Sequence, residues 1–424
     1  MTVAERLGSL VSDVAGGALP VRLRAWDGSE TGPAGGPTLV VRDRTALRRM
    51  LWHPNELGLA QAYITGEIDV DGDLADGLRQ VWRHARTTGL AGRGVKVGAG
   101  DRLRALRTAV RLGVLGPRPK APEAQAKLGG RLHTKARDRA AISYHYDLSN
   151  EFYALLLDEN MAYSCAYWTS DAPGYDLAAA QRDKLDLICR KLGLRPGMRM
   201  LDVGCGWGSL TVHAARHYGV DVTGVTLSAQ QRDYAAARIA ALGLGDRARV
   251  RLQDYRDVAD GPYDAVATVE MGEHVGDEQY PAFAAALHGL LAPQGRLLVQ
   301  QMSRGRRAPG GGAFIEAYVA PDMHMRPVGD TVSLLESAGL EIRDVHALRE
   351  HYVRTVAAWL ETLERRWDEV VDLVGEPVAR VWRLYLVGGA LTFEEGRMGV
   401  DQILAVRPGP AGASGVAPLG EAWR

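Results

Sequence analysis

The chain has 424 residues, of which 46% are hydrophobic and 24% charged, and this composition excludes an intrinsically disordered chain and allows two or three domains. The formal net charge is zero, but the segment from Arg83 to Arg139 holds 15 Lys and Arg residues against three acids, which predicts a surface that meets phosphate. Three cysteines without a CxxC pair exclude a disulfide framework and predict no metal site.

Short strand-like runs precede helical patterns in the first part of the chain. Strands are predicted over residues 19–26 and 38–43, and helices over 46–53 and 73–82. Residues 1–82 are therefore predicted to form a small α+β domain.

Residues 83–139 are predicted to be a basic linker, because Gly, Pro and Arg are interleaved there. An amphipathic helix is predicted within it from apolar residues at three- to four-residue spacing and from arginines over the remaining surface: Leu103, Leu106, Val110 and Val114, with Arg102, Arg104, Arg107 and Arg111. Such a helix can lie in an anionic lipid interface. A helix packed on its own protein with solvated arginines is the alternative.

Apolar strands alternate with helices from about residue 185 onward. Each predicted strand is an apolar run that a helix or a loop follows, and the strands cover residues 198–204, 220–227, 248–255, 263–271 and 295–303. This alternation predicts a parallel sheet with helices on both faces, a Rossmann-like α/β fold for residues 140–424. Ligands of such sheets lie at the carboxyl ends of the strands.

A glycine-rich turn follows the first of these strands and opens a helix. It contains Asp202, Gly204, Gly206, Trp207 and Gly208 in the sequence LDVGCGWG. Glycines tolerate positive φ and let the backbone approach a ligand closely. The turn carries Asp202 and Trp207 and lacks the dinucleotide pattern G-x-G-x-x-G, and it resembles motif I of class I methyltransferases. This resemblance implies an S-adenosylmethionine site rather than a nicotinamide site.

The next two strand ends complete the predicted cofactor site. The second strand is followed by four candidate contacts: Thr226, Leu227, Ser228 and Gln231. Most class I methyltransferases carry an acid here for the ribose hydroxyls, and Gln231 is the predicted substitute. The third strand ends in Asp254, Tyr255 and Arg256, a candidate adenine clamp whose alternative is ordinary surface packing.

Motifs that occur in one order along the chain carry a resemblance to a known family. They are His145 to Asn150, Tyr163 to Trp168, Asp202 to Gly208, Val225 to Gln231, Asp254 to Asp257, Glu273 to Gly276, and His351-Tyr352. Together they resemble the cyclopropane-fatty-acyl-phospholipid synthase and mycolic acid methyltransferase family over residues 140–400. The 20–82 region is similar to the N-terminal domain of the phospholipid-acting members, which favours a phospholipid acceptor.

The resemblance implies roles for individual residues. Tyr163 and Ser164 would join the glycine turn, residues 226–231, Tyr255 and Arg256 in contacting S-adenosylmethionine. Cys165, Glu273 and Tyr352 would line a site for bicarbonate, which takes up the proton released in the reaction. A lone Cys is also typical of a small buried hydrophobe, and Glu273 could cap the following helix.

Two departures from the family pattern concern the acyl pocket and the base. Gln300 stands where cyclopropane-forming members carry a His on the bicarbonate site, and Gly272 replaces an aromatic residue, with Glu270 just before it. The tract 318–329 also differs. These changes resemble the actinobacterial fatty acid 10-methyltransferases of the tuberculostearic acid pathway, so Gln300 joins the predicted catalytic residues.

The predicted reaction is methyl transfer to an oleoyl-type phospholipid chain, giving a 10-methylene product that a separate flavin- or NADPH-dependent reductase would saturate. A cyclopropane synthase, a small-molecule or nucleic-acid methyltransferase, and a lipid- or cofactor-binding protein with a silent site are the alternatives. No nucleic-acid partner is expected, because the chain lacks an Asn-Pro-Pro-Tyr-like motif and a Cys pair. A homo-oligomer stays open.

The N-terminal sequence lacks the apolar stretch of a signal peptide, and no run approaches the ~18 apolar residues that would span a bilayer. The cysteine usage favours a reducing compartment. A cytoplasmic protein in peripheral contact with the inner membrane face is therefore expected.

Overall fold

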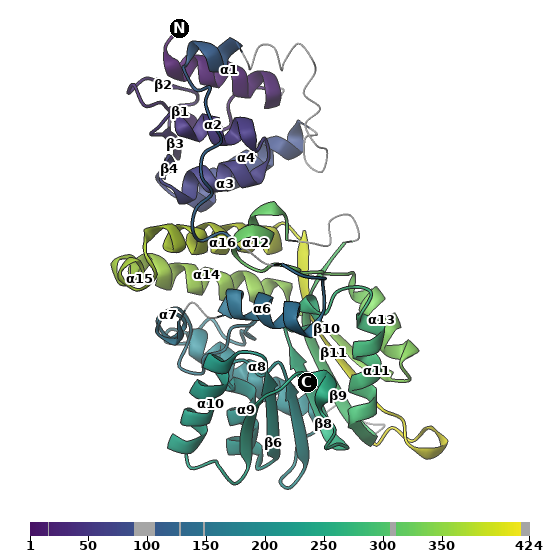
Figure 1. Cartoon of the computed structure of the whole chain (residues 1–424). Coiled ribbons are helices and arrows are strands. Elements are labelled where there is room, and N and C mark those ends of the chain that lie inside the picture. The colour runs from purple at the N-terminus through teal and green to yellow at the C-terminus, as the bar shows by residue number, and fades with distance from the viewer. Residues whose placement is uncertain (16, 89–106, 127–128, 147–148, 306–310, 417–424) are drawn as a thin grey trace. The chain divides into compact units, whose positions relative to one another are not determined.

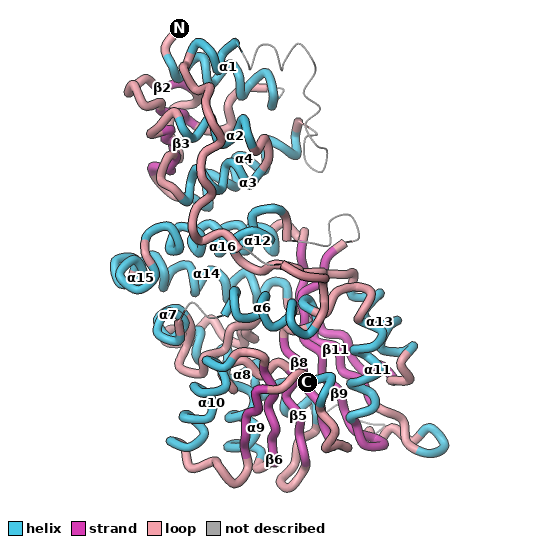
Figure 2. The backbone as a smooth tube through the Cα atoms, in the orientation of Figure 1, coloured by secondary structure: helices cyan, strands magenta, loops and turns pink. Residues whose placement is uncertain are grey.

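The computed structural model describes most of the chain: residues 1–15, 17–88, 107–126, 129–146, 149–305 and 311–416. It divides into two compact units (Figures 1 and 2). The smaller unit comprises Met1–Gln125 and Gly375–Leu391, and the larger comprises Ala126–Val374 and Thr392–Arg424.

The smaller unit is an α+β structure, as predicted. Its helices are α1 (Val3–Ala15), α2 (Thr45–Trp52), α3 (Glu56–Ile64), α4 (Leu74–Thr87) and most of α16 (Glu376–Glu394). Its strands are β1 (Arg22–Arg24), β2 (Glu30–Thr31), β3 (Thr38–Val41) and β4 (Ile68–Asp71), in the order β2-β1-β3-β4. The Asp69 carboxylate accepts hydrogen bonds from Arg42 at 2.8 Å and from Arg380 at 3.0 Å, and these ion pairs fasten α16 to β4.

The predicted domain boundaries differ from this division. The described residues of the 83–139 segment fall into both units, because residues 83–88 and 107–125 belong to the smaller unit whereas residues 126 and 129–139 belong to the larger one. Leu112 and Val114 are buried, and Arg48 donates to the Val114 carbonyl at 3.0 Å. Gly375–Leu391 also joins the smaller unit, a long-range association that a reading in chain order does not reveal.

The predicted amphipathic helix lies largely outside the described residues, which include neither Leu103 and Leu106 nor Arg102 and Arg104. Its described end, residues 107–111, is helical. There Val110 is exposed, whereas Val114 beyond the helix is buried, so these two residues do not share one face.

The larger unit is built on a seven-stranded sheet in the order β10-β11-β9-β8-β5-β6-β7. The strands are β5 (Arg199–Val203), β6 (Asp221–Thr226), β7 (Ala248–Leu252), β8 (Tyr263–Val269), β9 (Leu291–Arg304), β10 (Glu341–Ala347) and β11 (Met398–Val406). Strands β5 to β9 are mutually parallel, and Val203 pairs with Val225 on one side and with Thr268 on the other. The carboxyl ends of β5, β6 and β8 therefore meet at one edge.

The helices of this unit cover both faces of the sheet (Figure 1). They are α6 (Lys135–Tyr146), α7 (Asn150–Leu156), α8 (Leu177–Leu192), α9 (Ser209–Tyr218), α10 (Ala229–Ala241), α11 (Tyr280–Leu290), α12 (Ala313–Tyr318), α13 (Val328–Ser337), α14 (Arg349–Arg365) and α15 (Trp367–Val374), with 3-10 turns η1 (Tyr255–Asp257), η2 (Gly272–His274) and η3 (Pro410–Gly412). One apolar core joins the sheet to α11 and α13, and a second joins it to α8, α9 and α10. The predicted Rossmann-like α/β fold is confirmed.

Strands β10 and β11 were not predicted, and the sheet is not wholly parallel. Strand β11 is antiparallel to both β9 and β10. The alternation of strands and helices along the chain predicts parallel neighbours only, whereas β11 returns to β9 after nearly a hundred residues of mostly helical chain. This strand carries a buried amide, Gln402, that faces the site described below.

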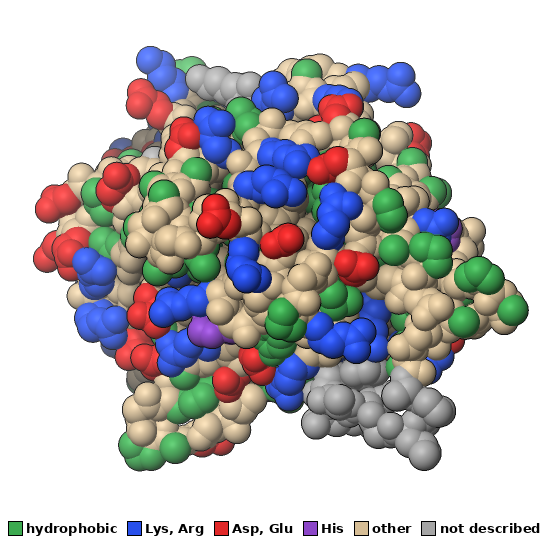
Figure 3. Space-filling view, turned by 90° about the horizontal axis from the view of Figure 1, so that it is seen from below, with side chains coloured by type: hydrophobic (Ala, Val, Ile, Leu, Met, Phe, Trp, Pro, Cys, Tyr) green, Lys and Arg blue, Asp and Glu red, His purple; other side chains and the backbone are tan. Residues whose placement is uncertain are grey.

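The surface is mixed in charge. Over the face seen in Figure 3, Lys and Arg side chains are interspersed with Asp and Glu side chains, as the zero formal charge requires on average. Among the described residues, the helices are too short or too polar to cross a bilayer.

Candidate active site

A cavity opens at the carboxyl ends of β5, β6 and β8 of the larger unit, with about 1180 Å³ of empty space that is partly continuous with solvent. The glycine-rich turn after β5 forms one wall. Gly206 has φ 54°, and a Cβ atom built on it would have no neighbour within 4 Å, because it would stand in the cavity. Gly204 has φ 75°, and its Cβ would lie 2.8 Å from Met271. Both positions therefore require glycine, one for the cavity and one for packing.

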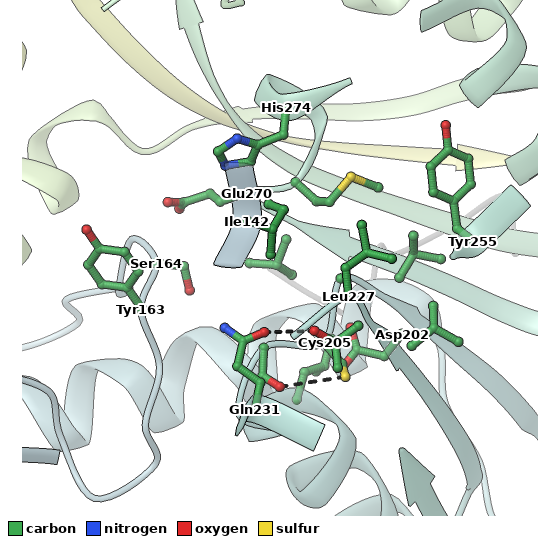
Figure 4. A pocket seen from close by; sticks show the side chains of 18 of the residues that line it. Ile142, Tyr163, Ser164, Asp202, Cys205, Leu227, Gln231, Tyr255, Glu270 and His274 are labelled. Carbon is green, nitrogen blue, oxygen red and sulfur yellow. Dashed lines mark hydrogen bonds between the residues drawn. The ribbon is translucent and has the colours of Figure 1, made fainter. Parts of the chain in front are cut away.

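The turn after β6 forms the next wall. Thr226 donates a hydrogen bond to the Gln231 side chain at 2.8 Å, which turns the Gln231 amide toward the cavity (Figure 4). Ser228 caps α10, since its hydroxyl accepts a hydrogen bond from the backbone N–H of Gln231, and Ser228 is buried and not among the lining residues. Ser228 therefore shapes the turn, whereas Thr226, Leu227 and Gln231 face the cavity.

The third wall combines η1 with helix α6. Arg256 donates to Asp254 at 2.6 Å and to Asp138 of α6 at 2.9 Å, so a single guanidinium joins the two elements. Asp138, Ile142 and Tyr255 line the cavity with them. The predicted clamp residues thus lie on the cavity together with Asp138 and Ile142 of α6, which precede the first motif.

A buried lysine supports the opposite wall, where Tyr163 and Ser164 lie in Figure 4. The Lys184 ammonium donates to the Ser164 hydroxyl at 2.7 Å and lines the cavity while 1% exposed. Burial lowers the pKa of Lys184, and the nearby carboxylates of Glu270, Asp158 and Asp202 oppose that shift. Sequence reasoning missed Lys184, although a lysine among the apolar positions of the sequence of α8 (Leu177–Leu192) is a detectable signal.

Glu270, directly after β8, is the glutamate that lines the cavity, beside the lining aspartates Asp138, Asp202 and Asp254. Its carboxylate accepts three hydrogen bonds: from the Cys165 backbone N–H at 2.8 Å, from the Gln300 amide at 2.9 Å, and from the Tyr352 hydroxyl at 2.6 Å. Three of the four predicted catalytic residues therefore converge on a residue that was noted only as a departure. Figure 4 shows Glu270 across the cavity from Tyr255.

Glu270 also holds an uncommon backbone conformation. Its φ is 52°, in the left-handed region that residues other than glycine rarely adopt. Strain of this kind persists where the surrounding structure fixes it, and it concentrates at functional sites. The three donors, and a 2.6 Å hydrogen bond from the Glu270 N–H to the Gln300 carbonyl, fix this residue.

Glu273, the predicted catalytic acid, does not line the cavity. One of its carboxylate oxygens accepts from the Met302 N–H at 2.5 Å, and in the described part of the chain the other is buried without a hydrogen-bond partner. Burial, together with the charge of Glu270, raises the pKa of Glu273 to about 8. The 3-10 turn η2 thus carries Glu273 outside the cavity lining, and its catalytic role stays a prediction.

The two acids differ because their donors differ. Burial raises the pKa of Glu270, but hydrogen bonds from Tyr352, Cys165 and Gln300 and the charge of Lys184 counteract the rise. For Glu273, backbone hydrogen bonds and the charge of Arg326 only partly counteract burial and the charge of Glu270. Three hydrogen bonds and a lysine thus favour the ionised form of Glu270, whereas a pKa of about 8 leaves Glu273 mostly protonated at pH 7.

Other titratable groups at the cavity are set largely by burial. Burial raises the pKa of Asp202 to about 6 against the hydrogen bond from Thr211, and it lowers the pKa of His274 to about 4. His274 lines the cavity as a neutral imidazole and was not predicted. Burial also raises the pKa of the Cys165 thiol well above its usual range, so Cys165 contributes its backbone N–H rather than a thiolate.

The structure sorts the predicted residues into two groups. Those that line the cavity are Tyr163, Ser164, Asp202, Gly204, Gly206, Thr226, Leu227, Gln231, Asp254, Tyr255 and Arg256. Those that do not are Gly208, Ser228, Cys165, Glu273, Gln300 and Tyr352. Of the second group, Gly208 serves the packing of α9, since its Cβ would lie 3.0 Å from Ala235, while Cys165, Gln300 and Tyr352 act on the lining acid.

The first family motif, residues 145–150, is only partly described by the structure. Asp147 and Leu148 of the first motif lie outside the described residues, but Asn150 accepts a hydrogen bond from the Trp207 indole at 2.8 Å. In the described part of the chain, no cluster of three or more His, Cys, Asp or Glu side chains is placed to hold a metal ion.

Comparison with known proteins places this site in a family. Residues 133–403 match the family model described as mycolic acid cyclopropane synthetase. The chain is 37% identical over 399 residues to a probable fatty acid methyltransferase of Pseudomonas putida, covering 92% of each chain. It is 34% identical over 407 residues to a tuberculostearic acid methyltransferase of Mycobacterium tuberculosis, covering 92% of this chain and 89% of the relative.

A solved structure gives the same result. A mycolic acid cyclopropane synthase crystallised with SAH and CTAB superposes with a TM-score of 0.58 and 31% identity. The match covers 63% of this chain and 98% of that one.

Proposed function

Since the chain belongs to the mycolic acid cyclopropane synthetase family and is an S-adenosylmethionine-dependent methyltransferase, we propose that it methylates the double bond of an oleoyl-type phospholipid chain and releases a 10-methylene product. The observation that carries the proposal is the Glu270 carboxylate, which faces the cofactor cavity and accepts hydrogen bonds from three predicted catalytic residues.

The cavity fits S-adenosylmethionine. The open space beside Gly206 admits a ligand against the backbone, and Gln231 offers an amide to hydroxyl groups. Tyr163 and Ser164 would hold the methionine end beside Glu270, and Tyr255 would pack near the adenine at the far side. When bound, S-adenosylmethionine supplies an electrophilic methyl group.

The chain's own residues must bring a weak nucleophile, an alkene, to that methyl group without water. Positioning of this kind can supply ~7–11 kcal/mol of barrier reduction. The new bond at C10 leaves a cation at C9 of the acyl chain. A hydride shift from C10 to C9 moves the cation to the methyl-bearing carbon, and loss of a proton from the methyl group then gives the exocyclic methylene.

Glu270 is the proposed acceptor of that proton. Its ionised form is held by Cys165, Gln300 and Tyr352, and it stands where these residues would otherwise have lined a bicarbonate site. The Glu270 carboxylate belongs to the chain and would accept the proton at one fixed position, whereas a bound bicarbonate ion could exchange between turnovers. Bicarbonate is therefore not needed in this proposal.

The product needs a second protein for saturation. A 10-methylene chain becomes a 10-methyl chain by addition of two electrons and two protons, which a flavin- or NADPH-dependent reductase would supply. The one predicted cofactor turn of this chain is of the methyltransferase type.

Access to a phospholipid is proposed through the smaller unit. Trp52, Val110 and Leu115 are about half exposed, and Arg107 and Arg111 are exposed beside Val110. Apolar and cationic side chains in this combination favour the interface of an anionic bilayer. The localisation that follows is peripheral, at the inner face of the membrane.

Purified protein given oleoyl phospholipid and S-adenosylmethionine tests the proposal. The modified chains should gain about 14 mass units, as one methylene group requires, and ozone should cleave the product at carbon 10. A product of the same mass that resists ozone would be a cyclopropane, and the proposed product would be rejected. Omission of bicarbonate should leave the rate unchanged, and a bicarbonate requirement would remove Glu270 from the role of base.

A further inference from the structure

A second buried amide stands behind Gln300. Gln402 on β11 is 0% exposed and lies directly opposite Gln300 in the antiparallel register of β11 and β9. Its Nε2 donates to the Gln300 Oε1 at 3.0 Å, and its own Oε1 is buried without a hydrogen-bond partner among the residues that the structure describes. Buried polar atoms nearly always have a hydrogen-bond partner. Packing alone therefore does not explain a buried amide at Gln402 whose oxygen has none.

The two amides form a chain with one direction. Gln402 donates to Gln300, and Gln300 donates to Glu270 at 2.9 Å and to the Cys165 carbonyl at 3.3 Å. If the Gln300 amide turned over, its oxygen would face a carboxylate and a carbonyl. Its nitrogen would then face the Gln402 nitrogen. Gln402 therefore satisfies the Gln300 oxygen in the one orientation that aims a donor at Glu270.

We propose that Gln402 is a positioning residue of the reaction, which holds the Gln300 amide as a donor and so keeps Glu270 ionised and able to accept the proton. The proposal rests on the proposed role of Glu270. It adds a residue that touches neither the cavity nor Glu270 and acts through Gln300 alone.

Other groups act on Glu270 from the elements packed around it. Tyr352 of α14 and Lys184 of α8 favour its ionised form, and Cys165 contributes its N–H. Glu273 of η2 also lies within reach of this charge, which raises the pKa of Glu273. These groups stay in place when β11 is altered, so a change at Gln402 reports on the amide chain.

The test is the pH dependence of turnover. Activity should fall on the acid side as Glu270 takes up a proton. Gln402→Met keeps the side-chain volume but leaves the Gln300 oxygen without a donor, so the acid limb should move up by about one pH unit, the worth of a weakened hydrogen bond to a charged group. The KM for S-adenosylmethionine should stay within about two-fold, because Gln402 lies outside the cavity.

Gln301→Met is the matched control. Gln301 is the next residue of β9 and is also buried, but its amide donates to Thr331 and accepts from Tyr280. Its loss should leave the acid limb where it is in the wild type. An equal shift in Gln301→Met would show that any buried amide on β9 has this effect, and the assignment to Gln402 would fall.

Gln402→Glu separates positioning from packing. A fully buried carboxyl is protonated near neutral pH and can donate to the Gln300 oxygen, so this variant should restore the wild-type acid limb and lose activity as the new acid ionises. An unshifted limb in Gln402→Met, or a Gln402→Glu limb displaced as far as that of Gln402→Met, overturns the inference. An active Glu270→Gln enzyme would instead overturn the proposed base.

Discussion

Replacing Glu270 with Gln removes the proposed base while keeping its shape. Gln can still accept hydrogen bonds through its oxygen, but its NH2 group would face one of the two donors that now bind separate oxygens, the Cys165 N–H on one side or the Tyr352 hydroxyl on the other. The loss of a positioned base reduces turnover by roughly 10²–10⁴-fold. We expect kcat to fall within this range and affinity for S-adenosylhomocysteine to change by less than about ten-fold.

Glu273→Gln is the matched variant, three residues away and equally buried. With a pKa of about 8, Glu273 is roughly nine-tenths protonated at pH 7, and a neutral amide replaces a protonated carboxyl with little change. The amide oxygen can keep the bond from the Met302 N–H. Turnover should therefore stay within a few-fold of the wild type, in contrast to the catalytic role predicted for Glu273 from the family resemblance.

The free energy of unfolding provides a second test of the Glu273→Gln variant. The pKa of Glu273 is raised on folding, so its carboxyl favours the folded state below the unfolded value of 4.5, and this advantage is lost as the pH rises toward 8. Glu273→Gln should thus gain stability relative to the wild type above pH 4.5, by at most about 3 kcal/mol at pH 7.

Single-turnover rates with oleoyl phospholipid and urea unfolding at pH 5 and pH 7 measure both quantities. The reasoning is refuted if Glu270→Gln turns over at near the wild-type rate, or if Glu273→Gln is the variant that loses turnover while remaining folded.

Three further outcomes are expected. Gly206→Val should abolish S-adenosylmethionine binding in calorimetry, because the side chain would enter the cavity at an unfavourable φ; undiminished affinity would place the cofactor elsewhere. Lys184→Met should weaken S-adenosylhomocysteine binding by about ten-fold or more, since Ser164 loses a charged donor; unchanged affinity would make Lys184 structural. Arg107→Glu with Arg111→Glu should reduce sedimentation with anionic vesicles at low salt, and unchanged sedimentation would favour a packed helix.

Much of the larger unit could be predicted because its strands are short apolar runs between helices. The glycine turn after β5 and the turn after β6 both lie on the cavity as their motifs indicated. Strand β11 could not be placed, because its pairing with β9 joins residues about a hundred positions apart and in opposite directions. The same holds for the association of residues 375–391 with the N-terminal unit.

The site was predicted less completely, and the reason is geometric. A motif gives the order of residues, but Glu270 and Glu273 differ by three positions across the end of a strand and the start of a 3-10 turn. That step decides which acid faces the cavity. The positive φ of Glu270 cannot be predicted from a single sequence. The burial of Lys184 could have been predicted, because this lysine stands among the apolar positions of a helix.

The placement of two buried acids in one site follows from how each is satisfied. Donors stabilise the ionised form of a carboxylate kept from water, and Glu270 has three donors from three separate segments and a lysine nearby. Burial and the charge of Glu270 raise the pKa of Glu273 to about 8, so Glu273 is mostly neutral at pH 7. The strained backbone at Glu270 is then the structural requirement for presenting the ionised acid, and not its neighbour, to the cavity.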